Sequence, residues 1–286
     1  MTRRTALTAL AALSASAQEK RLTANDVIER IKKNIGVPWK TPTVDTFKAG
    51  NPDTAVSGIA VTMMATLDVL ERAAAANRNL VITHEPTFYN HLDNTADLAK
   101  QDDAVLAGKQ AFIQQHNLVV WRFHDHWHAR RPDGILAGMT HALGWEKFQN
   151  AANQALFTLP RTTLNNLAES VKQKLNIRVV RVVGDPQLEI TQVGFLPGAA
   201  GSPRQIRLLE RDDVQALLIG ETPEWETVEY VADAVTEHKP KALIILGHIP
   251  SEQAGMEECT RWLKTFINEV PVEFIPAREP FWLPKS

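Results

Sequence analysis

Short, continuously apolar runs separated by amphipathic segments limit the fold of this sequence more than any other feature. Runs such as 79–83 and 242–246 are typical of strands buried inside a sheet. The expected strands are 57–62, 79–83, 118–123, 154–159, 177–183, 190–195, 214–219 and 242–246, and the expected helices are 27–35, 64–75, 102–116, 163–175, 226–238 and 251–268. Strands that alternate with helices predict an α/β protein with largely buried sheets.

Two segments, 144–150 and 237–241, are candidate boundaries between lobes. We therefore predict two related α/β lobes, 18–145 and 146–238. The segment 239–286 is expected to return as a strand and a helix that complete a site between them. With 286 residues, of which 44% are apolar, the chain is long enough to bury the core that this arrangement needs.

The composition excludes several classes of partner and cofactor. A net charge of −2 provides no basic surface, so we expect no nucleic-acid partner. The apolar runs are shorter than the roughly 20 residues of a membrane-spanning helix, so we expect no membrane span. The single cysteine, Cys259, rules out an intrachain disulfide and a cysteine-based zinc cluster, and we expect it to be buried.

The first 17 residues have the layout of a secretory signal peptide. Two arginines at 3 and 4 precede an apolar stretch at 6–13, and Ala-Ser-Ala at 15–17 forms an A-x-A cleavage site. The paired arginines also fit the twin-arginine variant, which exports folded proteins. We therefore expect an exported protein, periplasmic or extracellular. The alternative is a frayed N-terminus without an export role.

Metal-competent side chains follow three of the apolar runs at the point where each run ends. His84-Glu85 follows 79–83, the sequence His-Asp-His-Trp-His at 124–128 follows 118–123, and His248 follows 242–246, with Glu252 one turn later. Because α/β sheets place their sites at the carboxyl ends of strands, we expect these clusters to converge on one crevice. Imidazole and carboxylate ligands suit zinc, iron or manganese.

The stretch 124–128 allows a second interpretation. We expect it to be extended, so that His124, His126 and His128 share one face at the two-residue period. These three could then form a mononuclear zinc hydrolase core without His248. Each cluster could also be structural, as a loop cap, a solvated turn or a backbone hydrogen bond. The histidines expected to be structural or exposed are His91, His116, His141 and His238.

Residues 58–88 resemble the metal-binding opening of the Nif-three-like family. The family's His-His-Pro corresponds to 84–86, its His-Thr-Asn-Leu-Asp to 124–128, and its Gly-His-x-x-x-Glu to 247–252. A Gly-rich turn at 193–201 and a Gly-Glu strand end match in the same order. The resemblance implies an α/β fold, a toroidal hexamer and a dinuclear metal centre. Some members of the family are described as GTP cyclohydrolase homologues.

Carried over position by position, the resemblance implies that the ligands are His84, Glu85, His128, His248 and Glu252, and we add His124 as a metal-competent neighbour. Two positions have exchanged chemistry, because the family's second His is Glu85 here and its Asp is His128. The ligand charge is unchanged by this exchange. We therefore expect metal binding to persist with altered geometry, with two divalent cations per chain, or one if His128 cannot bridge them.

Two adjacent cations lower the pKa of a shared water and polarise a phosphoryl or carbonyl oxygen. We therefore predict a hydrolase of unknown substrate. Asp125 or Glu221 is expected to act as a catalytic base or to orient a ligating histidine. Arg130 and Arg131 are candidates for binding an anionic substrate, or else form an exposed basic turn. The alternative function is a non-catalytic metal-binding or scaffold toroid.

Overall fold

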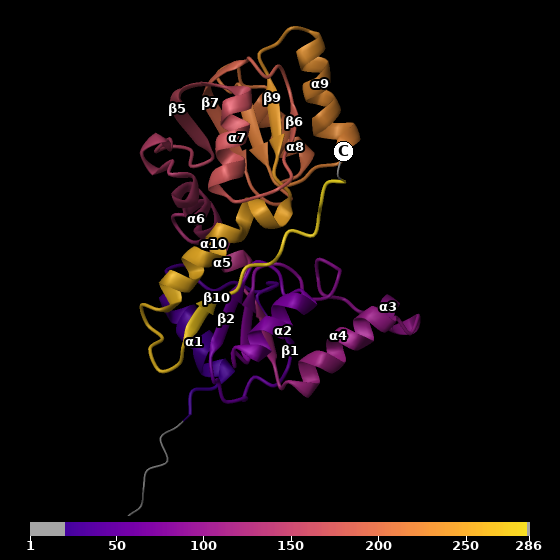
Figure 1. Cartoon of the computed structure of the whole chain (residues 1–286). Coiled ribbons are helices and arrows are strands. Elements are labelled where there is room, and N and C mark those ends of the chain that lie inside the picture. Colours follow the sequence, from indigo (N-terminus) through magenta and orange to yellow (C-terminus); the bar gives the residue numbers. More distant parts are fainter. Residues whose placement is uncertain (1–20, 285–286) are drawn as a thin grey trace, which may run out of the picture.

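The computed structural model describes residues 21–284, and the predicted signal peptide at 1–17 lies outside the described residues. The described chain forms two five-stranded sheets with helices beside them, arranged as two lobes (Figure 1). The prediction of an α/β fold with two lobes is confirmed. Between residues 21 and 284, no helix is both long and apolar enough to cross a membrane.

The first sheet contains the N-terminal strands and the last strand of the described chain. Its order is β1-β4-β3-β2-β10. The bounds are β1 Phe47–Ala49, β2 Ile59–Thr62, β3 Leu80–Thr83, β4 Val119–Arg122 and β10 Val272–Phe274. β1 runs antiparallel to β4, and the other neighbours are parallel. Every residue of β2, β3 and β4 is buried, which explains why these runs are almost continuously apolar.

The second sheet is also mixed. Its order is β5-β7-β8-β9-β6, with bounds β5 Leu156–Thr163, β6 Arg181–Val183, β7 Glu189–Leu196, β8 Ala216–Ile219 and β9 Ala242–Ile245. β7, β8 and β9 are parallel, while β5 and β6 close the two edges in antiparallel orientation. The strand predicted at 242–246 thus lies inside the second sheet, and only the chain after it returns to the first lobe.

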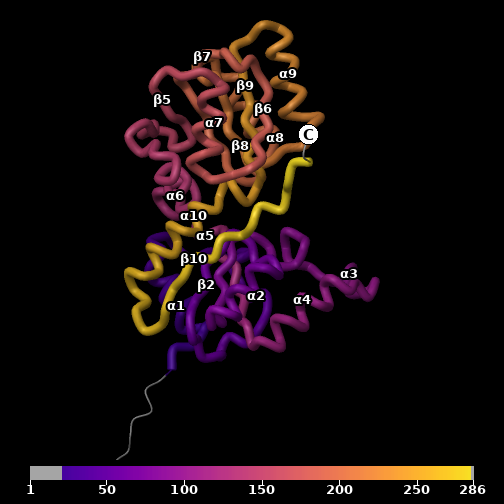
Figure 2. Tube along the Cα trace, viewed as in Figure 1, coloured from indigo at the N-terminus to yellow at the C-terminus, as the bar shows by residue number. Residues whose placement is uncertain are grey.

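Helices cover the sheets and connect the lobes. The bounds are α1 Ala24–Asn34, α2 Leu67–Ala75, α3 Ala96–Lys100, α4 Ala104–Gln115, α5 Asp125–Ala129, α6 Gly134–Leu143, α7 Leu164–Lys174, α8 Ser202–Leu209, α9 Glu229–Thr236 and α10 His248–Leu263, with short helical turns η1 Glu146–Phe148 and η2 Glu224–Val228. α10 follows β9 and leads to β10, so it runs from the second lobe to the first (Figure 1). Figure 2 shows that the chain after β10 then returns to the second lobe.

Contact between α6 and α10 fixes the position of α10. A β-carbon on Gly138 would overlap the backbone at Ala254, and one on Gly255 would overlap Ile135. The indole Nε1 of Trp127, on α5, donates to the carbonyl oxygen of Gly255 at 3.2 Å. The glycines therefore let α10 approach α5 and α6 at backbone contact, which sets where the first turns of α10 lie.

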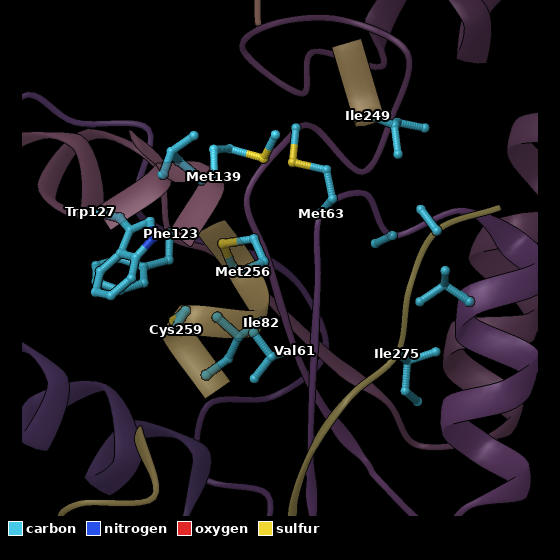
Figure 3. Close-up of a cluster of buried hydrophobic side chains, with 14 of the residues drawn as sticks. Val61, Met63, Ile82, Phe123, Trp127, Met139, Ile249, Met256, Cys259 and Ile275 are labelled. Carbon is cyan, nitrogen blue, oxygen red and sulfur yellow. The ribbon is translucent and has the colours of Figure 1, made fainter. Parts of the chain in front are cut away.

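One core of buried apolar side chains extends through both lobes. Figure 3 shows part of it, with Met256 and Cys259 of α10 in the same cluster as Val61 and Ile82 of the first sheet. Cys259 is buried, as predicted. A smaller cluster that includes Leu243 packs on the opposite face of the second sheet, because neighbouring residues of a strand point to opposite faces.

The structure corrects two local predictions and adds elements that the sequence pattern did not indicate. Residues 124–128, expected to be extended, include the first four residues of α5. Of the predicted strand 177–183, only residues 181–183 are a strand. The unpredicted elements are β1, β10, α3, α6, α8 and the short turn η1.

Candidate metal centre

The first group of candidate ligands stands at the carboxyl end of β3. His84 is fully buried, its backbone N–H donates to the oxygen of Thr62 at 3.2 Å, and its Nδ1 lies 3.0 Å from the oxygen of Phe123, beyond β4. Glu85 is 6% exposed, and Nη2 of Arg122 donates to its Oε2 at 3.2 Å. The parallel strands β3 and β4 therefore hold both side chains at one edge of the sheet.

The second group lies on α5. The carboxylate of Asp45 accepts the first three backbone N–H groups of the segment 124–128, at 2.6, 2.9 and 2.9 Å, which starts the helix directly after β4. His124 and His128 are four residues apart and share a helix face. The predicted face of three histidines is wrong, because His126 points away: its Nδ1 pairs with Asp45 and its Nε2 accepts the N–H of Lys40 at 2.9 Å. The three-histidine core is excluded with it.

The third group lies in the first turns of α10. Gly247 has a φ of +91°, a conformation that glycine adopts without strain, and it turns the chain from β9 into the helix. His248 and Glu252 are four residues apart and share the face toward β3. Gly198 lies against this face, since a β-carbon there would overlap the carboxylate of Glu252, and its N–H donates to Oγ of Ser251 at 3.0 Å.

The three groups converge, and all six predicted ligands meet: His84, Glu85, His124, His128, His248 and Glu252. Nε2 of His84 lies 3.2 Å from Nε2 of His128 and 3.7 Å from Oε2 of Glu252. Nε2 of His248 lies 3.3 Å from Oε1 of Glu85 and 3.4 Å from Oε2 of Glu252. Two sets, His84-His124-His128 and His84-Glu85-Glu252, have their ligand atoms within 4.8 Å of one another.

Each of the four imidazoles has its Nδ1 beside an acceptor. The partner of His84 is the Phe123 oxygen, and the partners of His124, His128 and His248 are Asp125 at 2.9 Å, Asp133 at 2.9 Å and Glu221 at 3.4 Å. An Nδ1–H that donates to such an acceptor leaves the Nε2 lone pair free for a metal, as is usual for ligating histidines. Neutral imidazoles cannot keep two Nε2 lone pairs at 3.2 Å without a proton or a cation between them.

The charges of the cluster are strongly coupled. Burial, together with the neighbouring imidazoles, holds the pKa of His84 well below its ordinary value, so this ring is neutral, as a ligand must be. Burial lowers the pKa of His248 too, but its contacts with Glu221, Glu252 and Glu85 outweigh burial and raise this pKa to about 12. The cluster therefore needs a positive charge beside its carboxylates, carried by a proton or by a metal ion.

Glu252 provides a further test of whether these residues fit a metal. Its side chain is 4% exposed, and its Oε2 is buried without a hydrogen-bond partner among the described residues. An unsatisfied buried carboxylate oxygen is costly and calls for an explanation such as an ion. Because this oxygen faces two histidine Nε2 atoms, at 3.4 and 3.7 Å, the residues present fit a divalent cation.

The cluster opens into a cavity of about 430 Å³. Its wall combines the ligands with the turn after β7, which includes Pro197 and Ala199, and with Arg204 at the start of α8. Arg204 is exposed, and no ion pair is recorded for it within residues 21–284. The cavity thus places a cationic side chain near the cluster, which suits an anionic substrate group.

The other predicted site residues have different positions. Asp125 lies against His124, and Thr43 and Val44 donate to its Oδ2 at 2.8 and 3.1 Å. Burial raises the pKa of this carboxyl, but these hydrogen bonds outweigh it and lower the pKa to about 2, so Asp125 orients His124 as an anion. Glu221 orients His248 in the same way.

The structure does not bring Arg130 or Arg131 to the cavity. The guanidinium of Arg130 lies over the rings of Trp127 and Trp262, 5.1 and 5.5 Å from their centres. Arg131 is exposed, and its Nη1 donates to three carbonyl oxygens at the end of α5, including that of His128 at 3.1 Å. Their predicted role in substrate binding stays a prediction that this geometry does not support.

Sequence reasoning missed several residues that shape the site. Asp45 starts α5, Asp133 orients His128 and caps α6, and Arg122 holds Glu85. His91, expected to be structural or exposed, is exposed but also lines the cavity. The sequence offered a signal only for Asp133, which precedes Gly134 at a helix start, where aspartate is a preferred cap.

Comparison with known proteins gives matches along most of the chain. The family described as Duf34/NIF3 (NGG1p interacting factor 3) matches residues 22–280. A protein of Clostridium acetobutylicum named GTP cyclohydrolase 1 type 2 homolog is 24% identical over 234 residues, 78% of this chain and 82% of that protein. The family match extends across both lobes and all three groups of candidate ligands.

Solved structures show the same fold. A hypothetical protein of Staphylococcus aureus has a TM-score of 0.71 at 16% identity, covering 92% of this chain and 100% of that one. A Bacillus cereus protein related to NIF3 also has a TM-score of 0.71, at 12% identity, covering 93% of this chain and 100% of that one. At these identities the similarity concerns the fold.

Proposed function

The chain belongs to the Duf34/NIF3 family, and on that premise we propose that it is a metal-dependent hydrolase whose reaction takes place in the 430 Å³ cavity. One observation carries the proposal. Four imidazoles have Nδ1 beside an acceptor. The Nε2 atoms of three of them lie 3.3–3.7 Å from Glu85 or Glu252, and that of His128 lies 3.2 Å from Nε2 of His84. One oxygen of Glu252 has no hydrogen-bond partner among the described residues. The metal ions that suit this set of donor atoms are divalent zinc, iron and manganese.

Two cations fit the donor set better than one. His84 belongs to two sets of candidate ligand atoms, one with His124 and His128 and the other with Glu85 and Glu252. Within each set the atoms lie within 4.8 Å of one another. His248 faces both carboxylates. When bound, such a pair of cations supplies an activated water nucleophile and polarises the phosphoryl or carbonyl oxygen of a substrate.

The protein's own groups position this machinery. Asp125, Asp133 and Glu221 fix the rings of the ligating histidines. Arg122 is fully buried, and it holds Glu85 by a charged hydrogen bond while its Nε donates to the His84 oxygen at 3.0 Å. Arg204 provides the cation that an anionic substrate group would meet at the cavity wall.

The substrate class is a phosphoester or an amide. The name of the Clostridium relative points to a nucleotide reaction, but we also propose export through residues 1–17, and nucleotides are scarce outside the cell. We propose in addition that the chain assembles as a homo-oligomer, with a hexamer as the state that the family resemblance implies. The mass and N-terminus of the secreted chain, and light scattering of the purified chain, test these two proposals.

The deciding experiment is the metal-to-protein ratio of the full chain, purified without chelator or nickel affinity and measured by elemental analysis. We expect a ratio near two, and loss of metal in Glu85→Ala and His128→Ala. His141→Ala is the matched control, because His141 is exposed and pairs only with Glu146 among the described residues. A ratio near zero that added metal cannot raise would overturn the proposal.

Turnover separates the hydrolase from the alternative of a non-catalytic scaffold. A panel of phosphoesters and amides is assayed with the metal-loaded protein and with a chelator-treated sample. We expect hydrolysis in the first sample alone. Two bound metals without turnover on any member of the panel would favour the scaffold, and a ratio near one would favour a mononuclear site.

A further inference from the structure

A second cavity, of about 670 Å³, lies beside His248. We refer to the 430 Å³ cavity at the candidate metal ligands as the ligand cavity. Its apolar wall comes from the start of α10, the end of β9 and the C-terminal segment, and includes Leu246, Ile249, Phe281 and Trp282. Its size is within the range of pockets that bind small molecules, which are mostly lined by apolar and aromatic side chains. His248 lines both cavities.

The aromatic wall is held in place by hydrogen bonds. The carboxylate of Glu279 accepts the backbone N–H groups of Arg178 and Val179, at 2.8 and 3.0 Å. The guanidinium of Arg178 donates to the carbonyl oxygens of Glu279 and Phe281, both at 2.9 Å. These contacts tie the returning chain to the second lobe, where Figures 1 and 2 show it ending near the helices of that lobe.

Large apolar side chains on this tied segment are exposed. Phe281 is 65% exposed and Trp282 is 71% exposed. Exposed apolar groups that cluster beside a cavity mark binding surfaces more often than scattered ones do. A rigid aromatic ring provides contact area at a low cost in conformational entropy. The segment therefore presents two aromatic rings at the edge of the cavity.

The charges around this cavity are compensated. Glu221 pairs with His248, Arg181 pairs with Glu224 at 2.6 Å, and Glu279 is bound by Arg178 and by backbone amides. Among the described residues of the lining, no cationic side chain is left without an acidic partner to receive an anionic group. The 670 Å³ cavity therefore suits an uncharged group. In the 430 Å³ cavity, by contrast, Arg204 suits an anionic group.

We propose that the 670 Å³ cavity binds the uncharged apolar part, an aromatic ring or a branched alkyl group, of the same substrate whose scissile group reaches the metal ligands. The part about the scissile group rests on the proposed hydrolase function. Binding of the apolar part does not, because it needs only the cavity and its aromatic wall. The two can thus fail separately.

The test uses 2-naphthol as an uncharged aromatic probe, with the chelator-treated full chain and with the metal-loaded one, by calorimetric titration. We expect saturable binding of one equivalent in both samples. Trp282→Ala should weaken it by about tenfold, the loss expected when one ring is removed from a binding contact. Trp225→Ala is the matched control, because Trp225 is 78% exposed and does not line the cavity.

A second variant removes the hydrogen bonds of Glu279 and keeps the indole ring of Trp282. Glu279→Ala should also weaken 2-naphthol binding, since the chain that carries Trp282 loses three of its hydrogen bonds. Equal melting temperatures of all variants show that the fold is intact. If 2-naphthol does not saturate, or binds Trp282→Ala as well as wild type, the proposal is overturned.

Two further outcomes are informative. If Trp282→Ala changes the mass measured by light scattering and leaves 2-naphthol binding unchanged, the aromatic residues form a contact between copies of the chain, and the proposal is wrong. If 2-naphthol binds as expected and no ester or amide is hydrolysed with metal present, the cavity proposal stands and the hydrolase function fails.

Discussion

Replacing Glu252 by Gln tests the metal centre most directly. The amide has nearly the same size as the carboxylate but carries no charge, and Oε2 of Glu252 has no hydrogen-bond partner to lose among the described residues. His248, which contacts Glu252 at 3.4 Å, keeps Glu85 and Glu221 as neighbours. Without metal, the free energy of unfolding of the variant should therefore lie within about 1 kcal/mol of that of wild type.

The metal-bound comparison should differ strongly. At a free metal concentration of 100 times the dissociation constant, binding stabilises the folded chain by about 2.7 kcal/mol. In a chain of this length that corresponds to a rise in melting temperature of roughly 5 °C. If loss of the charged ligand weakens metal binding by about 100-fold, the same metal concentration stabilises the variant by only about 0.4 kcal/mol. Its melting temperature should then rise by roughly 1 °C.

The assay is calorimetric unfolding of the full chain with and without added metal. Glu257→Gln is the control, because Glu257 lies on the same helix, is 53% exposed and pairs with Arg261 on the surface. It should keep the full metal-dependent shift. A Glu252→Gln variant that also keeps the full shift would refute the assignment of Glu252 as a ligand.

Three further predictions follow from positions around the site. Asp133→Asn should keep the cap of α6, since the amide oxygen still accepts backbone N–H groups, but should weaken metal binding by about 10- to 100-fold through the lost anchor of His128, as measured by competition with a chelator. Burial lowers the pKa of Lys109 to about 8, so between pH 8 and 10.5 the unfolded chain binds more protons than the folded one. From pH 7 to 10, the free energy of unfolding of wild type should therefore rise by roughly 2–3 kcal/mol relative to that of Lys109→Met. Urea titrations of both proteins that show no such rise would contradict this prediction. Gly138→Ala should push α10 away from α6 and reduce metal content, whereas Gly108→Ala, whose β-carbon meets nothing within 4 Å, should stabilise the chain by about 0.5–1 kcal/mol and keep its metal.

The sequence allowed the buried strands to be predicted, because burial on both faces leaves a visible mark. Residues 79–83 and 242–246 are almost wholly apolar, and β3 and β9 lie within one residue of these bounds. α6 was missed because its residues are apolar on nearly every side, and seven of its ten residues are buried, so it lacks an amphipathic period. β10 has three residues, too few for a pattern to be recognised.

The meeting of the candidate ligands could be predicted for the same reason, since they stand where apolar runs end. The residues that hold these side chains in position could not be predicted. Whether 124–128 is extended or helical depends on Asp45, which lies 79 residues before His124 and accepts its backbone N–H. Likewise, nothing in the local sequence indicates that Arg122, on a buried strand, holds Glu85. Long-range polar contacts decide the geometry of the site, and these leave no periodic signal in the sequence.

The position of α10 explains why both proposed sites meet at His248. Four of the candidate ligands follow β3 and β4 of the first sheet, whereas His248 and Glu252 enter from β9 of the second. A cation held by both sets would join the two lobes at the 430 Å³ cavity. At the 670 Å³ cavity, the hydrogen bonds of Glu279 join the returning C-terminal segment to the second lobe. With the proposed cation bound, the lobes would be connected at both of the cavities that His248 lines, and this would hold the two cavities at the fixed separation that a substrate spanning them requires.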